Sequence, residues 1–146
     1  MKLSTSRLLL AYATALGCFL LLDAGWLTLT SARIYRPALG HLMAAEVDWR
    51  AVAIFYPLYL IGLLVFAIKP ALEQRKATAA LWRGALLGFI SYAAYDFTNQ
   101  ATLRDWPWSL TAIDLAWGTF VSAATAWAAS LLTQLTFRPE RRRPAQ

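Results

Sequence analysis

Four long apolar runs constrain this chain more than any other feature of its sequence. Each run holds about 18 to 25 residues, which is the length that an α-helix needs to cross roughly 30 Å of hydrocarbon. Runs of this length predict membrane-spanning helices. The predicted spans are residues 8–30, 51–68, 81–103 and 108–132.

Composition supports the same fold class. Of the 146 residues, 59% are hydrophobic and only 15% are charged, which is more apolar than a soluble domain of this size. Four spans leave no room for a separate soluble domain, so we expect one transmembrane domain over residues 1–146. The predicted architecture is an all-α, four-helix membrane bundle, and any function must reside in the bundle or in its short loops.

The distribution of Lys and Arg predicts the orientation of the bundle. Ten of the 14 basic residues lie near the two ends or between the second and third spans, and four lie on the other side. Because Lys and Arg accumulate on the cytoplasmic side of membrane proteins, both termini are expected in the cytoplasm. The ten are Lys2, Arg7, Lys69, Arg75, Lys76, Arg83, Arg138, Arg141, Arg142 and Arg143, and the four are Arg33, Arg36, Arg50 and Arg104.

The segments outside the spans are short. In the first outer loop, Pro37 can begin a short interfacial helix that ends near Ala45, and residues 139–146 are typical of a disordered basic tail. The basic stretches lack the aromatic residues and motifs of nucleic-acid-binding proteins, so we expect membrane lipids as partners and no nucleic acid. A cleaved signal peptide is an alternative for the first run, but Asp23 and Trp26 make that run longer than a signal sequence requires.

One aspartate lies within each of three predicted spans: Asp23, Asp96 and Asp114. An aspartate at the centre of a bilayer costs roughly 2.5 to 3.5 kcal/mol, so three of them indicate a function or a dedicated structural role. The predicted orientation places each of them about fifteen residues, or roughly 20 Å, from the cytoplasmic edge. We therefore expect the three carboxyl groups in one layer, facing the interior of the bundle.

Polar and aromatic neighbours extend this layer. Tyr92, Asp96 and Asn99 recur at helical spacing and must share one face of the third span. The pattern Asp-x-x-Trp occurs in the first and fourth spans, where an indole N–H one turn away from the aspartate could hold a carboxylate or its ligand. The candidate ligand-binding residues are Asp23, Trp26, Tyr92, Tyr95, Asp96, Asn99, Asp114 and Trp117.

Small residues repeat at every fourth position in the third and fourth spans. Such stripes let helix backbones approach closely, either within one bundle or between two copies of the chain. The stripes therefore also predict a surface through which a homo-oligomer could form. Their members are Gly84, Gly88, Gly118, Ser122 and Ala126.

Two motifs give the chain a family resemblance. They are Tyr95-Asp96-Phe97-Thr98-Asn99-Gln100-Ala101-Thr102-Leu103 and Asp114-Leu115-Ala116-Trp117-Gly118-Thr119, accompanied by Phe55, Tyr56 and Tyr59 in the second span and by Asp23 and Trp26 in the first. With these residues, nearly the whole chain resembles the bacterial predicted membrane proteins of domain of unknown function 2177. The resemblance implies a small multi-pass protein of the bacterial inner membrane, and it implies no activity, substrate or catalytic residue.

The intramembrane acids agree with several kinds of function. In the first, an outward-facing pocket binds a lipid-like molecule or a hard cation such as Mg²⁺ or Ca²⁺, because carboxylates suit such ions and His41 stands alone. In the second, the aspartates are structural, paired with Arg33, Arg36 or Arg104 or hydrogen-bonded to Tyr, Trp or Asn of other helices. A membrane-embedded lipid-modifying enzyme and a proton or ion transport subunit are further alternatives, although no motif supports a particular reaction, cofactor or metal.

Overall fold

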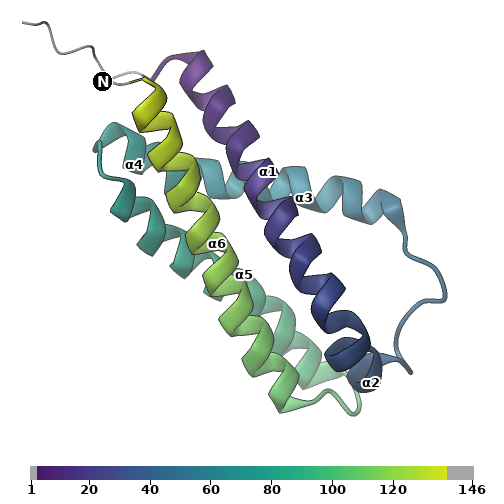
Figure 1. Cartoon of the computed structure of the whole chain (residues 1–146). Helices are drawn as coiled ribbons and strands as arrows, with labels where there is room; N and C mark the ends of the chain where they lie inside the picture. Colours follow the sequence, from purple (N-terminus) through teal and green to yellow (C-terminus); the bar gives the residue numbers. More distant parts are fainter. Residues whose placement is uncertain (1–2, 138–146) are drawn as a thin grey trace, which may run out of the picture.

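Helices form all of the regular secondary structure in residues 3–137, the part of the chain that the computed structural model describes (Figure 1). The single-turn elements η1 and η2 are π-helical and continue the helices before them. The predicted all-α class is therefore confirmed, while the predicted basic tail at residues 139–146 lies outside the described residues. The elements in chain order are α1 (Thr5–Thr30), η1 (Ser31–Tyr35), α2 (Arg36–Leu39), α3 (Trp49–Leu63), η2 (Leu64–Ile68), α4 (Lys69–Glu73), α5 (Ala77–Thr102) and α6 (Trp108–Thr136).

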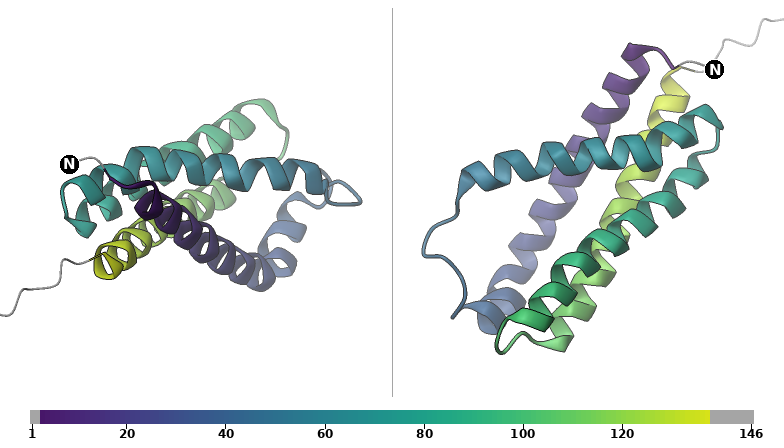
Figure 2. Two further views of the ribbon diagram at one scale, coloured as in Figure 1. Left: turned by 90° about the horizontal axis from the view of Figure 1, so that it is seen from above. Right: turned by 180° about the vertical axis from the view of Figure 1, so that it is seen from behind.

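Three of the long helices run along one another, and α3 crosses them. Figure 1 shows α1 and α5 running in the same direction with α6 antiparallel to both, and Figure 2 shows α3 crossing this group obliquely. Where the end of α3 and η2 meet the group, Leu60, Leu63 and Ile68 are fully buried beside Phe19 of α1 and Val121 of α6. The start of α3 stands away from the group and is mostly exposed. The core therefore lies where η2 meets α1, α5 and α6.

Within residues 3–137, three helical segments are long and apolar enough to cross a membrane: Thr5–Leu39, Trp49–Glu73 and Trp108–Thr136. They contain the first, second and fourth predicted spans. The third predicted span, residues 81–103, coincides with α5, which is 26 residues long but carries the polar run Asp96-Phe97-Thr98-Asn99-Gln100 in its second half. Because that run makes α5 less apolar than the others, length and composition identify three spans in place of the predicted four.

The segment after Thr30 differs from the predicted outer loop. The sequence has no Gly or Pro between Thr30 and Arg36, and η1 and α2 extend α1 as far as Leu39. Pro37 follows directly after η1, at the start of α2. The predicted separate helix from Pro37 to Ala45 is not found in that extent, because residues 40–48 form turns and irregular chain.

The predicted small-residue stripes pack α5 closely against α6. A Cβ added at Gly84 would lie 2.6 Å from the Ser122 carbonyl oxygen, and one added at Gly88 would lie 2.2 Å from the Gly118 carbonyl oxygen. Gly118 lies under the Tyr92 ring, where an added Cβ would be 2.2 Å from ring carbons. The stripes therefore face each other inside one chain. Association of two copies stays a prediction and would need another surface.

Candidate intramembrane acidic site

Asp23 occupies the point where α1, α3 and α6 converge, and it is only 8% exposed. The Tyr56 hydroxyl of α3 donates a hydrogen bond to Asp23 Oδ2, and the Trp117 indole N–H of α6 donates one to Oδ1 at 3.2 Å. Each carboxylate oxygen thus accepts a bond from a different helix. Asp23 therefore ties three helices together.

Asp114 of α6 has a similar aromatic partner. It is 6% exposed, and its Oδ1 accepts a 2.5 Å hydrogen bond from the Tyr35 hydroxyl at the end of η1. The Tyr35 oxygen also accepts a 3.0 Å bond from the Trp26 indole N–H. This arrangement depends on the continuation of α1 into η1, which holds Tyr35 on the same side of the helix as Trp26.

Two tryptophans join these carboxylates into one cluster. The rings of Trp26 and Trp117 stack with centroids 4.4 Å apart and planes 7° apart. The Trp117 indole donates directly to Asp23, and the Trp26 indole donates to Tyr35, which donates to Asp114. Each indole is therefore linked to the aspartate of the other Asp-x-x-Trp motif. An indole N–H thus does hold a carboxylate, but that carboxylate belongs to the opposite motif and not to the aspartate one turn away. We define the acidic cluster as Asp23, Trp26, Tyr35, Tyr56, Asp114 and Trp117.

Asp96 of α5 is fully buried but differs from the other two aspartates. Neither of its carboxylate oxygens has a hydrogen-bond partner within residues 3–137. It lies within electrostatic range of Asp114 and close to Thr111. Thr111 itself accepts a 3.1 Å bond from the Trp106 indole N–H and donates a 3.3 Å bond to Gln100. Because a buried carboxyl group without a partner is costly, the described residues give no structural reason for an acid at this position.

Tyr92 of α5 borders both the acidic cluster and an aromatic hollow. Its hydroxyl group lies within electrostatic range of Asp23 and Asp114. The hollow lies between α3 and α5 and has a volume of about 350 Å³. Phe55 on its rim is exposed, so the hollow reaches the outer surface of the bundle. The lining residues are Phe55, Tyr59, Ser91, Tyr92 and Tyr95.

Two of the predicted site residues, Tyr95 and Asn99, are not among the hydrogen-bond donors of the acidic cluster. Tyr95 is 57% exposed, and its ring packs edge-on against Trp106 with centroids 5.8 Å apart. Asn99 is half-buried. In the described part of the chain, the hydrogen bonds to Asp23 and Asp114 come from Tyr and Trp of other elements and not from either of these residues. Tyr95 nevertheless lines the hollow.

No basic side chain pairs with the acidic cluster within residues 3–137. Arg33, Arg36 and Arg104, the predicted structural partners, are all exposed, and the ion pair in the outer loop joins Arg50 to Asp48. This part of the chain also has no group of three His, Cys, Asp or Glu residues that could hold a metal ion. The arginine-paired structural hypothesis and the hard-cation hypothesis thus gain no support from the described residues.

Sequence reasoning missed two hydroxyl donors of the cluster. Tyr35 falls in the segment that was predicted as a loop, and Tyr56 received no role. The signal for Tyr35 was the absence of a helix breaker between Thr30 and Arg36, which permits α1 to continue. No local signal identifies Tyr56, because it lies 33 positions from Asp23 along the chain.

Comparison with known protein families confirms the resemblance. A family model described as predicted membrane protein (DUF2177) matches residues 8–131, which include every member of the acidic cluster. No curated protein and no solved structure matches the chain significantly. That description carries no activity, so a functional conclusion must come from the geometry of the site.

Proposed function

The chain belongs to the predicted membrane protein family DUF2177, and on that premise we propose that it binds an amphiphile with a cationic head at the acidic cluster. One observation carries the proposal. Asp23 and Asp114 are buried, receive hydrogen bonds from Tyr and Trp, and have no basic partner within residues 3–137. Acids inside a membrane mark functional sites by default. An ammonium group would supply the positive charge that the protein does not.

The aromatic side chains favour an ammonium head over a metal ion. Tyr56 belongs to the cluster and bonds Asp23 through its hydroxyl group, and cations bind favourably within about 6 Å of a Tyr ring face. A metal ion would need several oxygen ligands around one point. The described residues do not converge in that way. The cation of this proposal is therefore organic.

The hollow beside the cluster suits the apolar part of the ligand. Its walls are mostly aromatic, including Phe55, Tyr59 and Tyr92, and its volume of about 350 Å³ is typical of ligand pockets. The exposed rim at Phe55 would face lipid. An amphiphile would enter sideways from the bilayer, with its chain in the hollow and its head beside Tyr92.

We further propose four crossings of a bacterial inner membrane, with both termini in the cytoplasm and the acidic cluster in the outer half. The Arg7 guanidinium near the start of α1 donates a 3.4 Å bond to the carbonyl oxygen of Phe137, just after α6. Since the first helix begins where the last helix ends, the chain should cross an even number of times, so α5 should cross in addition to the three apolar segments. The excess of Lys and Arg at that end supports a cytoplasmic assignment.

A purely structural role for the acidic cluster is the second candidate. The hydrogen bonds that Asp23 accepts from Tyr56 of α3 and Trp117 of α6 would hold the helices together without any ligand. If the role is purely structural, loss of an aspartate lowers the free energy of unfolding and changes no other property. For catalysis or transport, residues 3–137 offer no specific supporting feature.

Lipid analysis of the purified full-length chain separates these two candidates. The double variant Asp23→Asn, Asp114→Asn removes both charges with little change in size. If the cluster binds an ammonium head, the amine-bearing amphiphile that co-purifies with the protein falls about tenfold or more, because hydrogen bonds to charged groups contribute about 1.5 to 3 kcal/mol. Mass spectrometry measures this amount per mole of protein. If the cluster is structural, the lipid profile stays constant while the melting temperature falls.

Asp105→Asn is the matched control. Asp105 is exposed in the turn before α6, and its φ of 58° suits Asn as well as Asp. This control should keep the wild-type amphiphile and stability. If the double variant does not fold, Asp114→Asn alone carries the test, since it leaves both bonds to Asp23 intact. Equal amphiphile content in wild type, control and site variants contradicts binding at the cluster.

A further inference from the structure

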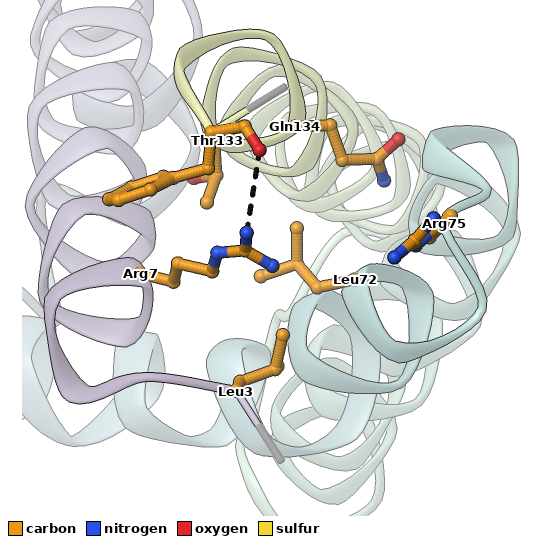
Figure 3. A pocket seen from close by; sticks show the side chains of 7 residues that line it. Leu3, Arg7, Leu72, Arg75, Thr133 and Gln134 are labelled. Atoms are coloured by element: carbon orange, nitrogen blue, oxygen red, sulfur yellow. Dashed lines mark hydrogen bonds between the residues drawn. The ribbon is translucent and has the colours of Figure 1, made fainter. Parts of the chain in front are cut away.

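A second pocket lies at the end of the bundle where the described chain begins and ends (Figure 3). It has a volume of about 290 Å³ and lies between the start of α1, the turn after α4 and the end of α6. It shares no lining residue with the acidic cluster or with the hollow beside it. We name it the terminal pocket, and the residues that matter most are Leu3, Arg7, Leu72, Arg75, Thr133 and Gln134.

Hydrogen-bond donors converge on the terminal pocket. Arg7 and Arg75 bring two guanidinium groups, and the described lining contains no carboxylate. Thr133 is 1% exposed, and its hydroxyl group has no hydrogen-bond partner within residues 3–137. The side-chain nitrogen of Gln134 is likewise buried without a partner there. Because buried polar groups normally have partners, the Thr133 hydroxyl and the Gln134 amide nitrogen indicate a ligand that accepts hydrogen bonds.

Arg7 is already directed into the terminal pocket, as Figure 3 shows. Its guanidinium donates to the Phe137 carbonyl oxygen at 3.4 Å, and its Cζ lies 5.1 Å from the centroid of the Phe137 ring. A bond of 3.4 Å is long, and a guanidinium has five N–H donors. Arg7 therefore keeps donors for a ligand while the ring of Phe137 holds its position.

We propose that the terminal pocket binds a phosphate monoester or diester. Guanidinium groups bind phosphate oxygens in bidentate pairs, and the Thr133 hydroxyl and Gln134 amide add two further donors. Leu3 and Leu72 provide apolar walls for the carbon atoms attached to the phosphate. Basic pockets between membrane helices on the cytoplasmic side bind anionic lipid headgroups. A soluble phosphate compound is the other source of the same chemistry.

Native mass spectrometry of the full-length protein in detergent tests this proposal, with phosphatidylglycerol and inorganic phosphate as separate probes. Wild type should retain phosphatidylglycerol, and Arg7→Gln should weaken that binding about tenfold or more. Thr133→Val should weaken it about tenfold, since the hydroxyl would donate a charge-assisted hydrogen bond to an anionic phosphate oxygen. Arg83→Gln is the matched control, because Arg83 is exposed on α5 outside the pocket, and it should bind as wild type does.

Thr133→Val also separates binding from folding. The Thr133 hydroxyl makes no bond in the described chain, so an isosteric methyl group should keep or raise the melting temperature without phosphate while affinity falls. Phosphatidylglycerol that resists excess inorganic phosphate supports a lipid headgroup, and displacement by inorganic phosphate supports a soluble compound. Equal binding of both probes by wild type, Arg7→Gln and Thr133→Val, or no binding by any of them, overturns the proposal.

Discussion

At the scale of single residues, Asp23 and Asp96 should respond to the same substitution in opposite directions. Asp23 has a donor on each carboxylate oxygen, so Asp23→Asn should lower the free energy of unfolding by about 1 to 3 kcal/mol. Asp96 has no partner in the described chain and lies near Asp114, so Asp96→Asn removes a buried, uncompensated carboxyl group next to a second one. It should raise the free energy of unfolding by about 1 kcal/mol or more. Reversible unfolding of each purified variant in one detergent measures both changes.

The sign of the Asp96 effect is the informative result, with Asp105→Asn as the reference for an exposed position. If Asp96→Asn lowers stability, Asp96 has a stabilising partner that residues 3–137 do not supply. In that case, a bound molecule beside Asp114 would supply the hydrogen bonds that Asp96 lacks. The ligand of the acidic cluster would then reach α5.

The positions of the three aspartates could be predicted because a carboxyl group facing lipid is costly, and all three are indeed buried. Their partners could not be predicted. Tyr35 lies 79 positions from Asp114, and Tyr56 lies 33 positions from Asp23, so neither contact leaves a local pattern in the sequence. Pairing of this kind depends on how the helices cross, which helical periodicity does not determine.

At the scale of helices, Gly88→Ala tests the contact between α5 and α6. Its Cβ would lie 2.2 Å from the Gly118 carbonyl oxygen and 2.6 Å from Ser122 Oγ, so the two backbones would have to separate. We expect a loss of about 1 to 3 kcal/mol in the free energy of unfolding. Gly17→Ala in α1 is the control, since nothing lies within 4 Å of its added Cβ, and it should gain roughly 0.5 to 1 kcal/mol. Equal stability of the two variants would contradict the close contact.

Periodicity predicted which faces of these helices are small, but not that the two stripes meet each other. A stripe in one helix is equally suited to a neighbouring helix and to a second copy of the chain. Composition also failed to identify α5 clearly as a membrane span, because Asp96, Asn99 and Gln100 are buried or half-buried in the bundle and yet lower the mean hydropathy of the helix. Because of this polar run, composition alone does not identify α5 as a membrane span, although α5 lies beside α6 along its length (Figure 1).

At the scale of the whole molecule, the two binding proposals place opposite charges at different depths. The acidic cluster and the terminal pocket both use α1, and Asp23 follows Arg7 by about 16 residues, or roughly 24 Å of helix. An acidic site toward the outer leaflet and a basic site at the cytoplasmic edge are consistent with the preference of Lys and Arg for the inner side. Both positions depend on the proposal of four crossings, and therefore on α5 crossing the membrane.

Single-cysteine labelling tests this requirement directly. Cys18, the only cysteine, is first replaced by Cys18→Ser, and one cysteine is then introduced at an exposed position by Ala44→Cys, Gln74→Cys or Thr102→Cys. With four crossings, a membrane-impermeant maleimide added outside intact cells or spheroplasts labels positions 44 and 102, and labels position 74 only after the membrane is opened. If α5 did not cross, positions 74 and 102 would lie on the same side and label alike. The chain would then cross the membrane an odd number of times, although the bond from Arg7 to Phe137 places the start of α1 beside the end of α6. That outcome would contradict the proposal of four crossings.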